Sequence, residues 1–405
     1  MKYIEGGVCA AKGFKASGLH CGVKSRKLDK KDVALIVSDC DCAAAAVYTK
    51  NVVKAAPLHV TKAHLADGIA RAVIANSGNA NACAPHGEEN AEKMCGFVTD
   101  ALGIPSENVI VASTGVIGQT INTAVIENGM PELVSLLDYN GSQMAADAIM
   151  TTDTVRKEAA VEIELEGKII HIGGISKGSG MIHPNMGTML CFITTDAAIS
   201  SKMLKTALLD TVNVTFNRIS VDGDTSTNDM CVIMANGLAE NTEITEQNEN
   251  YNIFVAALKE LCQTLARKMA ADGEGARHLI TCTVNGADSI EKAETIAKSV
   301  ISSTLTKAAI FGCDANWGRV LCAMGYSGAE FDPETVDVAF KSNAGEIQVC
   351  LSGRGLDFDE DLAKKILTEP EIEILIGLKE GDKECTCWGC DITYDYIKIN
   401  GDYRT

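Results

Sequence analysis

The segment Lys177-Gly-Ser-Gly-Met-Ile-His-Pro-Asn-Met-Gly-Thr-Met-Leu190 joins a polar, glycine-rich stretch to a short apolar run. Pro184 and Asn185 favour a bend, and residues 189–193 predict a buried strand. Gly187 can adopt backbone angles that are closed to other residues. Thr188 is therefore expected where a bent loop enters a strand.

A threonine hydroxyl at such a bend can attack the preceding carbonyl carbon and cleave its own chain. The product is a new N-terminal threonine, whose α-amine has an ordinary pKa of about 7.7–8.0. This amine can serve as the base for its own hydroxyl near neutral pH. The alternative is a glycine-rich turn that only leads into a strand, and the residues of this segment leave both interpretations open.

Neighbouring segments supply candidate partners for this threonine. Residues 161–172 alternate around Glu166-Gly167 and predict a hairpin that leads directly into the segment. Residues 108–112 predict a strand, and residues 113–118 a turn into a helix from about residue 120. Backbone N–H groups at such a turn can bind an anion. An ordinary structural turn is the alternative here.

The second half of the chain contains the clearest predicted helix, residues 252–270, with one apolar stripe. Glu274 follows it in a glycine-flanked loop, where a solvated surface carboxylate is the simplest expectation. Residues 220–229 are rich in Asp, Ser and Thr, but the spacing of an EF-hand is absent. Residues 391–400 alternate with period two and predict a strand.

The composition excludes several classes of protein. The chain has 405 residues, is 46% hydrophobic, and carries a net charge of −18 with a pI of about 4.9. Nucleic acids and anionic membranes are therefore poor partners. No apolar run approaches the length of a membrane span, so a cytoplasmic protein is expected. A GxGxxG or P-loop pattern is also absent, which argues against a nucleotide-binding fold.

The 16 cysteines are mostly scattered through apolar stretches, as expected for small core residues in a reducing compartment. Cys385, Cys387 and Cys390 are the exception. A site for a soft metal is conceivable there, but no second ligand cluster of matching spacing supports zinc. We therefore expect no metal.

Several motifs together resemble the ornithine acetyltransferase family of arginine biosynthesis. They are the 177–189 segment, Ala-Ser-Thr-Gly-Val-Ile-Gly at 112–118, and the C-terminal Asn-Gly-Asp-Tyr-Arg-Thr at 400–405. Family members usually have alanine where this chain has Gly187. The resemblance implies an α/β, layered, two-lobed sandwich related in layout to N-terminal-nucleophile enzymes. It also implies self-cleavage between Gly187 and Thr188. An α chain, residues 1–187, and a β chain, residues 188–405, would stay associated, as two of each.

The same resemblance implies roles for individual residues. Thr188 would be the nucleophile, and Thr114 with Gly115 would form the oxyanion hole. Lys177, Glu274, Asn400 and Thr405 would contact substrate, together with Thr188 and Thr151. Thr152 and Thr154 remain alternatives to Thr151.

The implied reaction transfers the acetyl group of N2-acetyl-L-ornithine to L-glutamate through an acetyl-threonine intermediate. It requires no metal or redox cofactor. Whether acetyl-CoA is a second acetyl donor is left open by the residues. Two rival classes remain, a hydrolase with the same threonine nucleophile, such as an aminopeptidase, and a cysteine-rich binding protein.

Overall fold

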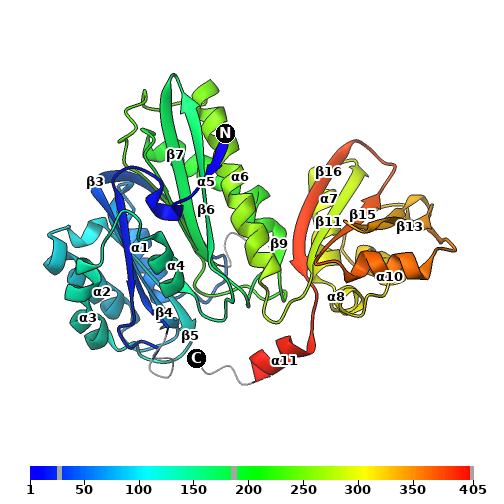
Figure 1. The fold of residues 1–405 in the computed structure, drawn as a ribbon, viewed down its shortest axis with the longest axis horizontal. Helices are drawn as coiled ribbons and strands as arrows, with labels where there is room; N and C mark the ends of the chain where they lie inside the picture. Colours follow the sequence, from blue (N-terminus) through cyan, green and yellow to red (C-terminus); the bar gives the residue numbers. More distant parts are fainter. Residues whose placement is uncertain (25–29, 184–188, 402–405) are drawn as a thin grey trace.

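The computed structural model describes residues 1–24, 30–183 and 189–401, and these form two lobes (Figure 1). The expectations for Gly187, Thr188 and Thr405 fall outside the described residues. The larger lobe contains the first half of the chain and continues to the end of the long helix α6 (Glu249–Ala271). The smaller lobe follows, and the C-terminal helix α11 (Tyr394–Gly401) leads back toward the larger one.

A nine-stranded sheet forms the centre of the larger lobe. Most neighbouring strands are antiparallel, but β8 with β10 and β4 with β5 are parallel. In spatial order the strands are β1 (Lys2–Ile4), β6 (Lys157–Leu165), β7 (Lys168–Lys177), β8 (Leu190–Thr195), β10 (Met230–Ala235), β3 (Val33–Tyr48), β4 (Ile69–Asn79) and β5 (Val109–Val116), and β2 (Phe14–Leu19) pairs with β3.

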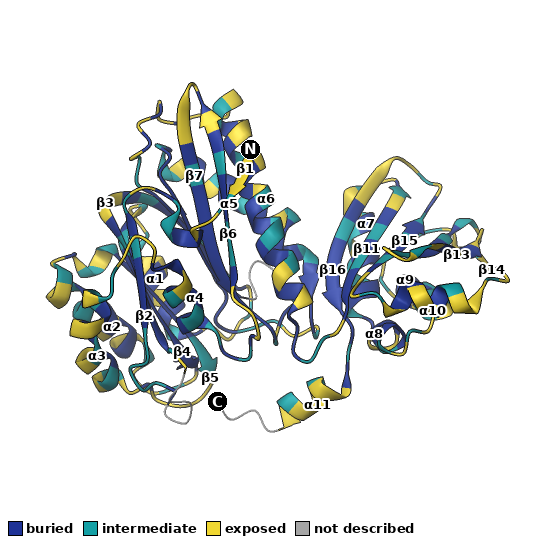
Figure 2. Ribbon diagram, in the orientation of Figure 1, coloured by how far each residue is buried: buried dark blue, intermediate teal, exposed yellow. Residues whose placement is uncertain are grey.

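Both faces of this sheet are covered, so β8 is apolar at every one of its first four positions. Cys191 and Ile193 pack in the core shared with α5 (Ser201–Val214) and α6, whereas Leu190 and Phe192 pack in the core shared with α4 (Ser142–Ile149). Burial on both faces explains the continuous apolar run. Figure 2 shows the buried strands beneath helices that are exposed on their outer surfaces. The remaining helices of this lobe are α1 (Ala56–His64), α2 (Gly87–Leu102), α3 (Thr123–Ser135) and the short η1 (Gly7–Cys9), η2 (Ser106–Asn108) and η3 (Phe216–Arg218).

The smaller lobe is a seven-stranded sheet with its own hydrophobic core. Its strands, in spatial order, are β14 (Arg354–Gly355), β13 (Gly345–Leu351), β12 (Asp337–Ser342), β15 (Glu371–Gly377), β11 (Leu279–Ala287), β16 (Lys383–Cys390) and β9 (Ile219–Ser220). Its helices are α7 (Ile290–Ser302), α8 (Thr304–Phe311), α9 (Trp317–Gly325), α10 (Glu360–Thr368) and η4 (Pro333–Thr335). The layered α/β architecture with two lobes is the predicted fold class.

Several local predictions are confirmed. The hairpin is β6–β7, and its turn residues Glu166 and Gly167 have φ values of 51° and 80°. Such positive φ values match a tight two-residue hairpin turn. The long helix is α6, and the side chains of its predicted stripe, from Phe254 to Met269, are fully buried.

Two predictions of local structure are wrong. Residues 113–118 do not turn at once, because β5 continues through Val116 beside β4. Residues 394–401 form helix α11 rather than a strand. The Thr393 hydroxyl donates to the Gly275 carbonyl and accepts the Asp395 N–H, which starts a helical turn. None of the helix residues is buried, so no sheet covers the apolar side chains of the alternating pattern.

The expected cleavage point does not coincide with the boundary between the lobes. It falls between β7 and β8, which are neighbours in one sheet, with Lys177 opposite Leu190. Residues 1–187 and 188–405 both contribute strands to this sheet, so hydrogen bonds and two cores would hold the cleaved pieces together. The division itself stays a prediction. Among the described residues, no helix has the length and apolar character needed to cross a bilayer.

Candidate active site

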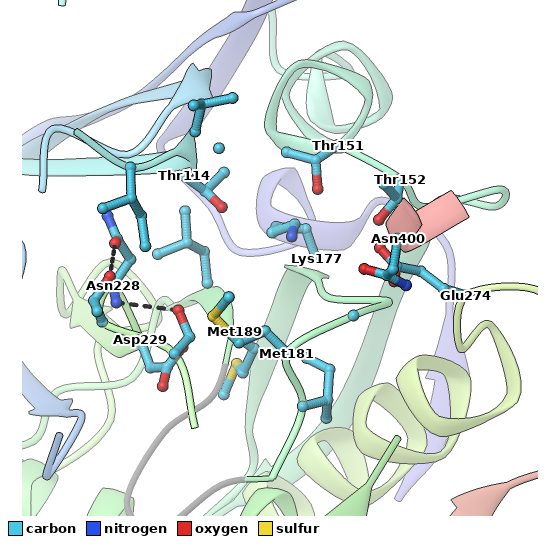
Figure 3. Close-up of a pocket in the computed structure, with 18 residues that line it drawn as sticks. Thr114, Thr151, Thr152, Lys177, Met181, Met189, Asn228, Asp229, Glu274 and Asn400 are labelled. Atoms are coloured by element: carbon cyan, nitrogen blue, oxygen red, sulfur yellow. Dashed lines mark hydrogen bonds between the residues drawn. The ribbon is translucent and has the colours of Figure 1, made fainter. Parts of the chain in front are cut away.

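A cavity of about 250 Å³ opens in the larger lobe, where β5, β7, β8 and β10 meet the loop after α6 (Figure 3). It is formed by segments that are far apart in the sequence. The lining residues are Thr114, Gly115, Val116, Ile117, Thr151, Thr152, Lys177, Gly180, Met181, Ile182, Met189, Leu190, Ser226, Thr227, Asn228, Asp229, Glu274 and Asn400. Thr114, Gly115, Thr151, Lys177, Glu274 and Asn400, the described residues with a proposed role, are all in this set, and so is the alternative Thr152.

Thr114 and Gly115 lie at the end of β5, pressed against the end of β4. Gly115 has a φ of 134°, and a Cβ atom added to it would lie only 2.3 Å from the Gly78 carbonyl carbon and 2.5 Å from the Asn79 nitrogen. Only glycine fits this approach of two backbones. The Asn228 amide fixes the same strand ends by donating to the carbonyls of Ala80 at 2.6 Å and Ser113 at 2.8 Å.

Lys177 ends β7 and belongs to a buried network of charges. Its Nζ lies 3.8 Å from Oδ2 of Asp153. Lys157 Nζ lies 2.7 Å from the other oxygen of Asp153 and 2.5 Å from Asp272. Burial alone would raise the pKa of Asp153, but Lys177 and Lys157 outweigh it and hold that pKa well below its usual range.

The Asp153 carboxylate also orders the backbone of the cavity wall. It accepts the N–H of Thr151 at 3.0 Å and of Gly178 at 2.8 Å. Thr151 and Thr152 both line the cavity, whereas the Thr154 hydroxyl donates to Asp272 outside it. The geometry therefore separates Thr154 from the other two alternatives.

Glu274 is 6% exposed and does not lie on the open surface. Its N–H donates to the Ser179 carbonyl at 2.9 Å, and Asn400 Nδ2 donates to its Oε2 at 2.7 Å. Gly180 makes room for the carboxylate, because a Cβ atom there would fall within 2.5 Å of three of its atoms. Helix α11 brings Asn400 to this position from the end of the smaller lobe (Figure 1).

Met189, the residue bonded to Thr188, lines the cavity, and its carbonyl accepts the Met230 N–H at 2.8 Å. The residue that follows the expected nucleophile therefore forms part of the cavity wall. In Figure 3, Met189 lies between Thr114 and Asp229 on one side and Glu274 on the other.

Sequence reasoning did not identify Asn228 and Asp229 as cavity residues. Asp229 is 2% exposed, and its Oδ2 has no hydrogen-bond partner among the described residues. Burial raises its pKa well above the usual range, against the opposing effects of Ser226, Thr49, Lys177 and the Met189 amide. The family resemblance places residues 220–229 near the active site without a role for any one of them, and their polar composition does not distinguish a surface loop from a cavity wall.

The three clustered cysteines are core residues of β16. Cys385 and Cys387 pack inside the smaller lobe, whereas Cys390 packs in the core of the larger one. Burial raises the pKa of Cys390, with Lys307 opposing it. In the described part of the chain, no group of three or more His, Cys, Asp or Glu side chains is placed to hold a metal ion.

Comparison with known proteins gives concordant matches. The model of the ArgJ family matches residues 15–405. The arginine biosynthesis bifunctional protein ArgJ of Symbiobacterium thermophilum is 48% identical over 406 residues, covering 100% of both chains, and that of Geobacillus kaustophilus is 46% identical, covering 99% of this chain and 97% of the relative. A crystal structure of ArgJ from Bacillus halodurans is 45% identical, covers 51% of this chain and 96% of that chain, and superposes with a TM-score of 0.49. Matched by the family model and by relatives of full length, the chain belongs to the ArgJ family.

Proposed function

We infer that this chain is an acetyltransferase of arginine biosynthesis that moves the acetyl group of N2-acetyl-L-ornithine to L-glutamate, giving L-ornithine and N-acetylglutamate. Its relatives, 44–48% identical along almost the whole chain, are arginine biosynthesis bifunctional proteins. The observation that carries the inference is the single cavity that holds Thr114, Gly115, Lys177, Glu274 and Asn400 beside Met189.

We propose Thr188 as the nucleophile, released by self-cleavage after Gly187. Its freed α-amine takes the hydroxyl proton, and the oxygen attacks the acetyl carbonyl carbon. Thr114 and Gly115 line the same cavity, where a hydroxyl and a backbone N–H would stabilise the negative oxygen of the tetrahedral intermediate. Ornithine leaves, and the glutamate amine then takes the acetyl group from the threonine ester.

The charges of the cavity suit N-acetylornithine, which has a carboxylate at one end and an ammonium group at the other. We propose that Lys177 binds the carboxylate. Glu274 binds the ammonium, because among the described residues its carboxylate accepts a hydrogen bond only from a neutral amide, that of Asn400. Thr151, or its neighbour Thr152, would line the acetylornithine site, and Thr405 would complete it from the C-terminus.

The proposal is tested first on the intact protein. Denaturing electrophoresis and N-terminal sequencing should show two pieces, the second of which begins at Thr188. The Thr188→Ala variant should remain one chain without activity, whereas Thr188→Ser should retain part of the self-cleavage and part of the activity. An active enzyme that runs as a single full-length band would contradict this mechanism.

Substrate assays separate the proposal from its rival. Incubation with N-acetylornithine alone should release at most one ornithine per site, and glutamate should restore continuous turnover. Continuous release of acetate without glutamate would indicate a threonine hydrolase. We propose that the chemistry needs no metal or redox cofactor. An assay with acetyl-CoA in place of N-acetylornithine tests for a second activity. We also propose that the assembly holds two α and two β pieces.

A further inference from the structure

We propose that Asp229 is a further catalytic residue of this site, which donates a proton to the departing ornithine amine and recovers it from the incoming glutamate ammonium. This inference rests on the proposed acetyl transfer. It names a proton donor for the departure of ornithine and a proton acceptor for the arrival of glutamate, two steps for which the mechanism proposed above names no residue.

The backbone of Asp229 is fixed at the centre of the sheet. Its carbonyl accepts the N–H of Thr49, the residue after β3, at 3.0 Å. In the parallel pairing of β10 with β8, Met230 lies opposite Leu190, so Asp229 lies beside Met189 at the start of both strands. Residue 188 is bonded to Met189, so the nucleophile proposed above directly precedes, in the chain, the residue that lies beside Asp229.

The carboxyl group is available for proton transfer. It lines the cavity, and its Oδ2 has no hydrogen-bond partner among the described residues. A buried, charged oxygen that lacks a partner is costly, and burial correspondingly raises the pKa of Asp229. The neutral acid is therefore favoured over a wider pH range than for an exposed aspartate.

Each group that faces this carboxyl group favours loss of the proton rather than gain. The charged one is Lys177 from β7, and the neutral ones are the hydroxyls of Thr49 and Ser226 and the amide of Met189. Burial therefore raises the pKa of Asp229 against the effect of these groups, and the nearby Lys177 cation favours the ionised form. This combination suits a group that must give and regain a proton within each cycle.

The proton transfers of the reaction give such a group a defined task. Formation of the acetyl-threonine ester moves the hydroxyl proton to the ornithine nitrogen and leaves a neutral amine. The O–H bond of Asp229 then breaks, and ornithine departs as an ammonium ion. Glutamate arrives as an ammonium ion that cannot attack. Its N–H bond breaks as the carboxyl O–H re-forms, and the freed amine takes the acetyl group while the threonine oxygen regains its proton.

The test isolates the second half of the cycle. Acetyl-enzyme is prepared with N-acetylornithine from the cleaved fraction of wild type and of Asp229→Asn. Its loss is followed by intact mass after mixing with glutamate or with hydroxylamine, which is already unprotonated at neutral pH. With glutamate, the variant should react about 10²–10⁴-fold more slowly. With hydroxylamine, the two proteins should react at similar rates.

The pH dependence gives a second readout. The variant must wait for glutamate whose amine is already free, so its rate should rise about tenfold per pH unit below the pKa of that amine. Wild type should show a much flatter profile near neutral pH. The matched control is Asp224→Asn, which removes an exposed carboxylate from the same loop and should behave as wild type.

The outcomes separate the two proposals. Equal rates of wild type and Asp229→Asn with glutamate would overturn this inference and leave acetyl transfer intact. An equal loss with both acceptors would overturn it as well, because it would indicate a structural role. If Asp229→Asn neither cleaves its own chain nor forms the acetyl-enzyme, infrared spectroscopy of the wild type tests whether Asp229 transfers a proton. The carbonyl band of a protonated buried carboxyl group should change on addition of N-acetylornithine, and the absence of any change would refute the proposal.

Discussion

Replacement of Lys157 by methionine removes the cation at the centre of the buried network behind the cavity. The Lys157 side chain is fully buried and lies 2.7 Å from Asp153 and 2.5 Å from Asp272. Methionine fills a similar volume without charge. Asp153 would then keep Lys177, at 3.8 Å, whereas Asp272 would lose its ion pair with Lys157.

The expected loss of stability follows from these distances. With an effective dielectric constant of about 20, each of the two short contacts contributes about 6 kcal/mol before desolvation is counted. Removing the lysine recovers several kcal/mol of desolvation cost but leaves an uncompensated negative charge. Breaking a buried pair in this way typically costs about 3–5 kcal/mol. We expect Lys157→Met to lower the free energy of unfolding by that amount near neutral pH.

The pH dependence of this loss has a defined sign. In the wild type the pKa of Asp153 is held low, so its ionisation stabilises the fold above the unfolded-state pKa of about 3.9 and this contribution is lost as pH falls through the folded-state pKa. In the variant, Lys177 alone opposes the effect of burial where Lys177 and Lys157 did so together, and the pKa of Asp153 should rise. The difference in the free energy of unfolding between wild type and Lys157→Met should therefore be largest near neutral pH and should become smaller toward about pH 4.5.

Urea unfolding followed by circular dichroism at the two pH values measures this difference. The control is Lys168→Met on the same hairpin, whose side chain is half-exposed and 3.8 Å from Glu240. Its loss should stay below about 1 kcal/mol. A loss for Lys157→Met as small as that of the control, or one that is the same at both pH values, would refute the reasoning.

Three further predictions concern the cavity. Thr114→Ala should lower kcat of the cleaved enzyme about 10²–10³-fold with little change in KM or melting temperature, and normal kcat would exclude it from the oxyanion hole. Gly115→Ala should destabilise the protein by about 1–3 kcal/mol and lower kcat as well, because the new Cβ meets the backbone at Gly78; unchanged thermal unfolding would contradict this. Glu274→Gln should raise KM for N-acetylornithine about tenfold or more, and an unaltered KM would argue against the ammonium contact.

The sequence alone determined the local elements with strong periodicity. The β6–β7 hairpin, helix α6 and the apolar run of β8 follow from side-chain patterns that their own residues contain. The family was also readable, because the motifs around Lys177, Thr114 and Asn400 occur in one order along the chain. The acetyltransferase assignment followed from that resemblance and is supported by the full-length relatives.

The tertiary structure decided which residues share the cavity. Asp229 and Glu274 look like ordinary loop carboxylates in the sequence, and they are buried because distant strands and the Ser179–Gly180 turn close around them. The alternation at 391–400 favoured a strand, but a strand needs an edge with free N–H and C=O groups, and the Thr393 hydrogen bonds start a helix instead. Local patterns report on neighbours along the chain, whereas burial and charge pairing depend on residues hundreds of positions away.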